Sequence, residues 1–261
     1  MSAVPVSSAA SRPLLRAEGL ALGPGCLPLD EAVHPGEIVG LAGLEGHGQE
    51  RFLTTLAGLT RPAAGRVTVE TSAGGSETLV SLAQAARHGV VYLPRDRRST
   101  GIFPAMSVLD NFGVPSMSLF ARGGILRRLA QRAALADYTS FLSIRYPDMT
   151  APITALSGGN QQKVLLARWL ALNPRLMLLN DPTRGVDLQT RMKFYDVFRD
   201  LAREKGIALV VLSTEIEEIL QLCGRVLVFR DAALSQRIDR ADMTMDRVLA
   251  AMFGQTEVVQ P

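Results

Sequence analysis

LSGGNQQKV, residues 156–164, is followed about twenty residues later by NDPTRGVD, residues 180–187. The Ser-Gly-Gly at residues 157–159 precedes a stretch for which we predict a helix over residues 161–172. A helix start carries exposed backbone N–H groups and a positive dipole end, and glycines let an anion approach the backbone closely. Ser157 adds a hydroxyl group that can donate to an anion or cap the helix. Ser-Gly-Gly alone is usually an ordinary helix start, so the surrounding motifs decide its meaning.

A second segment, GLEGHGQE, begins at Gly43 and has the glycines of a phosphate-binding loop. It lies between a predicted strand and a predicted helix, and Gly43, Gly46 and Gly48 are in register with G-x-x-G-x-G-K-[ST]. Gln49 stands where the pattern has its phosphate-binding lysine, and Glu50 stands where it has the Mg²⁺-binding Ser or Thr. At about 4 Å and an effective dielectric of about 20, each misplaced unit charge costs on the order of 4 kcal/mol. We therefore expect this loop to bind MgATP poorly.

Length and composition limit the classes of protein to which the chain can belong. At 261 residues the chain can bury the core of one large domain or of two lobes, and its net charge of +3 gives no support for nucleic-acid binding. Cys26 and Cys223 lie far apart, which fits unpaired thiols in a reducing cytoplasm, and the histidines have no metal-ligand spacing. No apolar run approaches the roughly 18 residues of a membrane span. We expect residues 1–13 to form a disordered leader or the remnant of a linker.

Apolar runs of strand length alternate with helical patterns along most of the chain. We predict strands at residues 37–42, 89–93, 176–179, 207–212 and 225–229, and helices at residues 49–59 and 188–204. This alternation is typical of an α/β fold with a mostly parallel sheet. Residues 14–22 and 65–82 have the pattern of flanking antiparallel strands. Between about residues 103 and 155 we expect helical pieces without strands, broken at Gly123-Gly124, and therefore an inserted helical lobe.

Together these motifs resemble an ATP-binding cassette (ABC) ATPase, and the spelling from LSGGNQQKV to PTRG is similar to the second cassette of ribose/galactose/xylose-type sugar importers. The resemblance covers roughly residues 14–254, including a C-terminal helix near residues 243–253. It implies a P-loop NTPase cassette with ATP and Mg²⁺ as cofactors. The implied domains are a RecA-like core at residues 14–102 and 166–254, a helical subdomain at residues 103–165 that ends in the signature motif, and a tail at residues 255–261.

The resemblance also assigns roles to residues that depart from the family pattern. Asn180 falls where the Walker B motif has its metal-orienting aspartate, and Asp181 falls on the catalytic glutamate that polarises the attacking water. Aspartate is one methylene shorter, so we expect it to reach that water poorly. Thr214 occupies the switch-histidine position, and Arg95 replaces the glutamate at the Q-loop position. We therefore expect an ABC-type ATPase subunit whose own Walker site is catalytically impaired.

The intact motifs belong to the other face of a cassette. In ABC dimers, each nucleotide lies between the P-loop and Walker B of one cassette and the signature motif of the other. The altered residues would face the chain's own nucleotide. The residues that would face the partner's nucleotide are the signature residues Ser157, Gly158, Gly159, Asn160 and Gln161, with Asp187 of the D-loop. This asymmetry predicts a subunit that completes the ATP site of a partner cassette.

The implied partners are those of an importer subunit: a second ABC cassette, fused or separate, membrane permease subunits and, indirectly, a periplasmic or extracellular sugar-binding protein. The implied location is cytoplasmic, peripheral on the inner face of the cell membrane. The permease would dock around Phe103, Met106, Val108, Leu109 and Phe112, although the helical spacing of the last three is more typical of core residues. Two alternatives stay open: a non-transport ABC-family ATPase, and a non-catalytic regulatory or interaction module that has lost ATP binding.

Overall fold

The computed structural model describes residues 11–71, 74–122 and 125–255, and these residues form two compact units. Unit 1 comprises the described residues up to Tyr92, Arg175–Asp181 and the residues from Phe198 onward, and unit 2 comprises Leu93–Pro174 and Pro182–Val197. Most of the expected leader, the Gly123-Gly124 break and residues 256–261 of the expected tail lie outside the described residues. Among the described residues, no helix has the length and apolar character that crossing a membrane requires.

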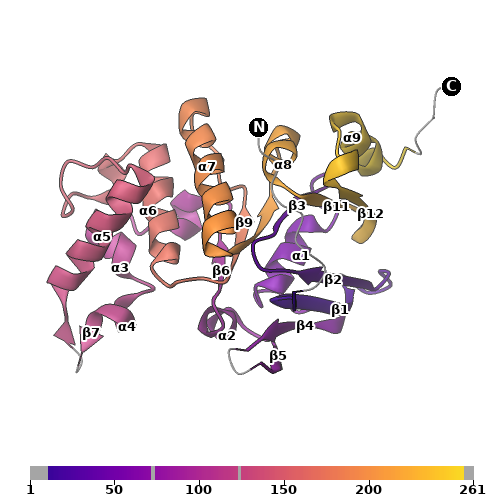
Figure 1. Ribbon diagram of the computed structural model, residues 1–261, viewed down its shortest axis with the longest axis horizontal. Helices are drawn as coiled ribbons and strands as arrows, with labels where there is room; N and C mark the ends of the chain where they lie inside the picture. Colours follow the sequence, from indigo (N-terminus) through magenta and orange to yellow (C-terminus); the bar gives the residue numbers. More distant parts are fainter. Residues whose placement is uncertain (1–10, 72–73, 123–124, 256–261) are drawn as a thin grey trace. The chain divides into compact units, whose positions relative to one another are not determined.

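The main sheet of unit 1 has the strand order β12-β11-β3-β10-β9-β6 (Figure 1). β3 pairs in parallel with β10 and β11, β10 pairs in parallel with β9, and the edge strand β12 is antiparallel to its neighbour β11. Every residue of β3, β9 and β10 is buried, as continuous apolar runs in a parallel sheet predict. The strands are β3 (Ile38–Ala42), β6 (Val90–Leu93), β9 (Leu176–Asn180), β10 (Ala208–Leu212), β11 (Arg225–Arg230) and β12 (Ala233–Asp239). The predicted central strands are thereby confirmed.

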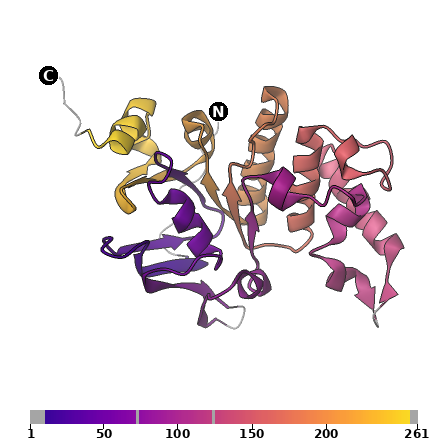
Figure 2. The ribbon, with the colours of Figure 1, turned by 180° about the vertical axis from the view of Figure 1, so that it is seen from behind.

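A second, antiparallel sheet has the order β2-β1-β4-β5, which confirms the predicted flanking strands. Its strands are β1 (Leu15–Ala21), β2 (Leu29–Val33), β4 (Ala64–Glu70) and β5 (Ser76–Thr78). Helix α1 (Gln49–Leu56) lies between the two sheets, and its Phe52 packs on Phe229 of β11 with ring centroids 5.1 Å apart (Figures 1 and 2). Buried residues of both sheets and of α1 form one hydrophobic cluster, so the start of α1 is rigidly placed.

Four further helices complete the main-sheet elements: α2 (Leu82–Arg87), α7 (Leu188–Lys205), α8 (Ile216–Leu222) and α9 (Met245–Phe253). α8 packs against β3, and α9 packs against β11 and β12. A methyl group at Gly40 of β3 would lie 2.7 Å from the Ile219 side chain of α8, so the glycine permits this close packing. The predicted C-terminal helix corresponds to α9.

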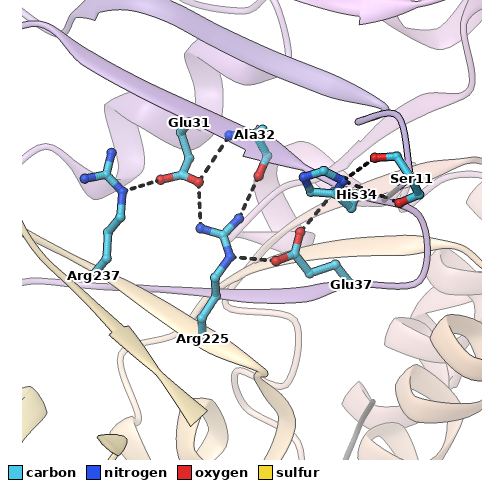
Figure 3. A network of polar contacts seen from close by, with 7 residues as sticks. All are labelled: Ser11, Glu31, Ala32, His34, Glu37, Arg225 and Arg237. Atoms are coloured by element: carbon cyan, nitrogen blue, oxygen red, sulfur yellow. Dashed lines mark hydrogen bonds and ion pairs between the residues drawn. The ribbon is translucent and has the colours of Figure 1, made fainter. Parts of the chain in front are cut away.

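Arg225 links the two sheets of unit 1 through a buried ionic network (Figure 3). Its guanidinium group donates to Glu37 at 2.6 Å, to Glu31 of β2 at 2.6 Å and to the carbonyl oxygen of Ala32 at 2.6 Å. Arg237 of β12 donates to the second carboxylate oxygen of Glu31 at 2.9 Å. Burial acts to lower the pKa of Arg225, but the two carboxylates outweigh it and the pKa is raised. The charges are therefore paired within the network.

Unit 2 consists mainly of helices, with α3 (Val108–Gly113) packed against both α5 (Arg128–Leu142) and α6 (Gly158–Leu170). The expectation of a lobe without strands is wrong for one short hairpin, β7 (Ala121–Arg122) with β8 (Ile125–Leu126), which follows α4 (Met117–Phe120). Strands of two residues are too short to produce an alternating pattern. Val108, Leu109 and Phe112 are buried, which confirms their core role, whereas Phe103 and Met106 are 43% and 41% exposed.

A buried arginine ties α6 to the start of unit 2. Arg168 donates to the carbonyl oxygen of Asn111 at 2.6 Å, to that of Gly101 at 2.6 Å and to the side-chain oxygen of Asn111 at 3.0 Å. Burial lowers the pKa of Arg168 to about 10. Asn111 in turn bonds to the main chain of Phe103, so α6, α3 and the segment before α3 are held together by satisfied polar groups.

We expect Arg225→Ala to lower the free energy of unfolding by about 3 kcal/mol, because it leaves the buried carboxylate of Glu37 without its arginine and that of Glu31 with Arg237 alone. The side chains of Glu31 and Glu37 are only 8% and 12% exposed. Arg66→Ala is the matched control, since Arg66 pairs with Glu18 at side-chain exposures of 61% and 38% and should cost less than about 1 kcal/mol. Urea titrations followed by circular dichroism measure both. Equal losses in the two variants would contradict the structural role of Arg225.

Candidate functional site

Except for Arg95, which lies in unit 2, the residues predicted to face the chain's own nucleotide meet at one edge of the main sheet in unit 1. The loop from Gly43 follows β3, Asn180 ends β9 with Asp181 after it, and Thr214 lies two residues beyond β10. Because β3, β10 and β9 are parallel neighbours, their carboxyl ends lie side by side. Ligands of open parallel sheets bind at such an edge.

The backbone of the loop has the shape that a phosphate site needs. Gly48 is the N-cap of α1 with φ 104°, and Gly46 also has a positive φ of 84°. A side chain at Gly48 would lie 2.9 Å from the Cα atom of Ala232, in the turn of the β11–β12 hairpin. The N–H of Ala232 donates to the carbonyl oxygen of His47 at 3.1 Å, so the hairpin braces the loop. Glycine is required at Gly48 by both its conformation and this close approach.

The side chain of Gln49 is folded back onto its own loop. Its amide nitrogen donates to the carbonyl oxygens of Gly43 at 3.0 Å and Leu44 at 2.8 Å. Its amide oxygen is buried and has no hydrogen-bond partner among the described residues. Gln49 therefore uses its donors on the main chain, where a lysine would extend a positive charge toward phosphate.

Glu50 and Asn180 are hydrogen-bonded directly to each other. The side-chain nitrogen of Asn180 donates to a carboxylate oxygen of Glu50 at 2.9 Å and to the hydroxyl oxygen of Tyr92 at 3.2 Å. Burial raises the pKa of Tyr92, and the charge of Glu50 adds to the rise, so the phenol stays neutral. The sequence analysis missed Tyr92; its position near the end of the strand predicted at residues 89–93 was the available signal.

Asp181 is joined to Thr214. One carboxylate oxygen of Asp181 accepts from the backbone N–H of Thr214 at 2.7 Å and from its hydroxyl group at 3.2 Å. Asp181 is 5% exposed and has a positive φ of 48°. The structure thus brings together the two residues predicted at the base and switch positions, with one carboxylate oxygen already engaged.

The side chains described at this edge present acceptor groups and no cation at the position of the phosphate-binding lysine. Gln49 and Asn180 each present a buried amide oxygen without a partner among the described residues, and Glu50 adds an exposed carboxylate. These groups are acceptors, whereas phosphate oxygens need donors or cations. Within the described part of the chain, no group of three or more His, Cys, Asp or Glu residues could hold a metal ion. The backbone cradle is present, but Gln49 supplies no cation at the clamp position, and the oxygen groups of Glu50 and Asn180 replace the hydroxyl and carboxylate of the family pattern.

The signature residues lie in unit 2, at the start of α6. The helix begins at Gly158, three residues earlier than predicted, because the side chain of exposed Ser157 caps it by accepting from the N–H of Asn160 at 3.4 Å. A methyl group at Gly158 would overlap the guanidinium group of Arg97, so glycine is needed there for a close approach. The start of α6 thus has the backbone N–H groups of a helix N-terminus, with Ser157 exposed, Gly158 half-buried and Gly159 buried.

The polar residues that follow the glycines hold unit 2 together. Four successive side chains bond to three segments of the unit. Asn160 accepts from the N–H of Arg145 at 2.8 Å, and Lys163 donates to the carbonyl oxygen of nearby Ser143 at 2.8 Å. Gln161 donates to the carbonyl oxygen of Leu156 at 3.0 Å, and Gln162 donates to that of Pro182 at 2.7 Å. Gln161 is buried with its side chain turned into the unit. The NQQK spelling therefore fixes the position of Ser157 and the glycines.

Asp187 and Arg95 also lie in unit 2. Asp187 caps α7 by accepting from the N–H of Thr190 at 2.9 Å, and the hydrogen bonds from Thr190 lower its pKa. Next to Arg95, the guanidinium group of Arg97 donates to the carbonyl oxygen of Arg184 at 2.8 Å. The sequence analysis missed this contact with the region before Asp187.

A phosphate loop between a parallel strand and a helix, beside polar residues at the end of a neighbouring strand, is the arrangement of a P-loop nucleotide-binding domain. The model of the family described as ABC transporter matches residues 27–184. The chain therefore belongs to the ABC transporter family and is an ATP-binding cassette. Members of this family use ATP and Mg²⁺.

The curated relatives described below carry the names of sugar import proteins. The chain is 37% identical over 92% of its length to the ribose import ATP-binding protein RbsA of Jannaschia sp. (strain CCS1), and covers 46% of that protein. It is 38% identical over 85% of its length to the arabinose import ATP-binding protein AraG of Chromohalobacter salexigens, and covers 44% of that protein. The chain thus spans about half the length of the curated relatives it matches.

Solved structures confirm the fold class. An ABC transporter cassette in its ADP conformation aligns with a TM-score of 0.75 at 19% identity, over 94% of this chain and all of the other (100%). A dimeric cassette in a post-hydrolysis state, bound to ADP and Pi, aligns with a TM-score of 0.73 at 20% identity, over 87% of this chain and 98% of the other. The predicted α/β P-loop cassette with a mostly parallel core sheet is confirmed.

We expect the triple variant Gln49→Lys, Glu50→Thr, Asn180→Asp to bind MgATP at least roughly tenfold more tightly than the wild-type chain, because it restores a cation and a metal ligand to an intact loop. Titration with a fluorescent ATP analogue, with and without Mg²⁺, measures this. Wild-type affinity should depend little on Mg²⁺. The control carries the same changes at exposed positions, Gln236→Lys, Glu217→Thr and Asn173→Asp. Wild-type binding as tight as that of the triple variant would show that the loop works by other chemistry.

Proposed function

We propose that the chain is an ATP-binding subunit of a sugar-type ABC importer whose signature face completes the ATP site of a partner cassette, while its own Walker site contributes little hydrolysis. The proposal rests on the hydrogen bonds that the side chains at the P-loop edge make to one another and to the loop. Gln49 bonds to its own loop, and Glu50 bonds to Asn180. In the family, these positions bind the phosphates and the metal ion.

The distribution of altered and intact residues supports the same division of labour. The altered residues Gln49, Glu50, Asn180 and Asp181 lie in unit 1, whereas the signature residues and Asp187 lie in unit 2; Arg95 is the altered residue that lies in unit 2. Ser157 and the two glycines retain the elements of an anion site at the start of a 13-residue helix. In this proposal, Ser157 and the N–H groups of Gly158 and Gly159 bind the terminal phosphate of the partner's ATP, and buried Gln161 positions them.

The partners follow from the names of the relatives and from the family. We propose a second cassette, fused or separate, and membrane permease subunits that receive sugar from a periplasmic or extracellular binding protein. The names of the relatives, ribose and arabinose import ATP-binding proteins, support a pentose or similar sugar as cargo. The proposed location is the cytoplasmic face of the cell membrane, where the exposed Phe103 and Met106 of unit 2 are candidates for the permease contact.

In the reconstituted importer, substitutions in the signature motif should lower activity strongly, whereas a substitution in the P-loop should have little effect. Ser157→Arg or Gly159→Asp should lower ATPase activity and transport on the order of 100-fold, because a bulky or anionic side chain occupies the space of the partner's phosphate. Gln49→Ala should change both rates by less than about threefold, since Gln49 contributes no charge to its site. ATPase and vesicle uptake assays on the assembled complex provide the measurement.

Ser235→Arg is the control for Ser157→Arg, because Ser235 is an exposed serine on β12 in unit 1. Gly159 is buried, and a methyl group there would lie 3.2 Å from the Thr190 side chain, so assembly of the Gly159→Asp complex must be verified by co-purification. Equal sensitivity of the two faces, or indifference to Ser157→Arg, would rule out the composite site.

A further inference from the structure

A pocket of about 370 Å³ lies entirely within unit 2 and is lined by Arg95, Asp96, Arg97, Arg98, Arg184 and Gly185. Four of these six residues are arginines and one is acidic. The pocket has the volume of a small-molecule site, for which about 300–1,000 Å³ is usual. It combines the loop after β6 with the segment before Asp187, and neither the P-loop nor Ser157 lines it.

Asp96 is the one acidic residue among the four arginines of the pocket and offsets only part of their charge, and its carboxylate is also engaged in the local fold. One oxygen accepts from the N–H groups of Arg98 at 2.9 Å and Ser99 at 3.4 Å, and the other accepts from the hydroxyl group of Ser99 at 2.7 Å. These bonds cap the π-helical turn Arg97–Gly101 and lower the pKa of Asp96. The single acidic residue of the pocket therefore shapes the loop that carries the arginines.

Arg97 joins the two segments that line the pocket. Its guanidinium group donates to the carbonyl oxygen of Arg184 at 2.8 Å and to the side-chain oxygen of Gln161 at 3.4 Å. Both acceptors are neutral, so these bonds fix the position of Arg97 without cancelling its charge. Burial lowers the pKa of Arg97 and the adjacent charge of Arg98 lowers it further, whereas Asp96 acts to raise it but does not outweigh them. An anion in the pocket would relieve this repulsion.

We propose that this pocket binds a phosphate-bearing anion through Arg98 and Arg184, with Arg95 contributing charge and Arg97 holding the two segments in place. Guanidinium groups offer paired N–H donors that match phosphate oxygens. A free phosphate or polyphosphate and the phosphate chain of a nucleotide share this chemistry. The proposal does not rest on the composite ATP site, because the pocket belongs to one chain and is complete without a partner.

The test is calorimetric titration of the whole chain with inorganic phosphate, pyrophosphate and ADP in Mg²⁺-free buffer. We expect one pyrophosphate per chain, and at least roughly tenfold weaker binding by the double variant Arg98→Ala, Arg184→Ala. The control, Arg61→Ala with Arg132→Ala, removes two exposed arginines elsewhere and should bind like the wild type. ADP that competes with pyrophosphate identifies a nucleotide as the source of the phosphate, and ADP that does not compete identifies a free anion; both support the pocket.

Three results would overturn the proposal. The first is no binding of pyrophosphate at millimolar concentration, and the second is equal weakening in the two double variants, which would indicate non-specific attraction to positive charge. The third is binding of a glutamate-rich peptide without binding of pyrophosphate, which would make the pocket a protein contact. Urea midpoints close to that of the wild type confirm that the double variants are folded.

Discussion

The parallel pairing of β3, β10 and β9 is the constraint on which the site depends. It brings the loop after β3, Asn180 at the end of β9 and Thr214 after β10 to one edge of a fully buried sheet. The core around α1 then fixes the direction of the loop. Since the backbone geometry is supplied by the fold, exchanging side chains at this edge changes its chemistry without dismantling it. Glu50 and Asn180 illustrate the point. In the family pattern, position 50 carries a neutral hydroxyl side chain and position 180 carries a carboxylate. In this chain, position 50 carries the carboxylate and position 180 the neutral amide, and the two side chains are hydrogen-bonded to each other.

The two units carry different chemistry as a consequence. In unit 1, buried amide oxygens and an exposed carboxylate make the P-loop edge rich in acceptors, which repel a phosphate chain. In unit 2, a capped helix start, a buried polar scaffold and a group of arginines present donors and positive charge. An ABC dimer places these two kinds of face opposite each other. A cassette with one acceptor-rich edge and one donor-rich face is suited to serve its partner's nucleotide more than its own.

Much of this structure could be predicted from the sequence, for identifiable reasons. Buried parallel strands are continuous apolar runs, so β3, β9 and β10 were found within a residue or two, and the P-loop and signature motifs located the site. The β7–β8 hairpin is too short to have a period. The bond between Gln49 and its loop, the contact of Tyr92 with Asn180 and the bond between Arg97 and Arg184 join residues that are placed by the fold or by rotamer choice. A sequence pattern identifies which residues are present, whereas these contacts depend on the position of each residue in the fold and on the rotamer of its side chain.

The central claim is that one cassette of the pair holds the nucleotide for hydrolysis and this chain supplies the opposing face. Its most direct test is the stoichiometry of nucleotide trapped by vanadate in the complex of this chain with an intact partner cassette, measured by quantifying ADP after gel filtration and by photolabelling each subunit. The account predicts one trapped ADP per pair, with the label on the partner. Two trapped ADP molecules per pair, or a label on this chain's P-loop, would contradict it.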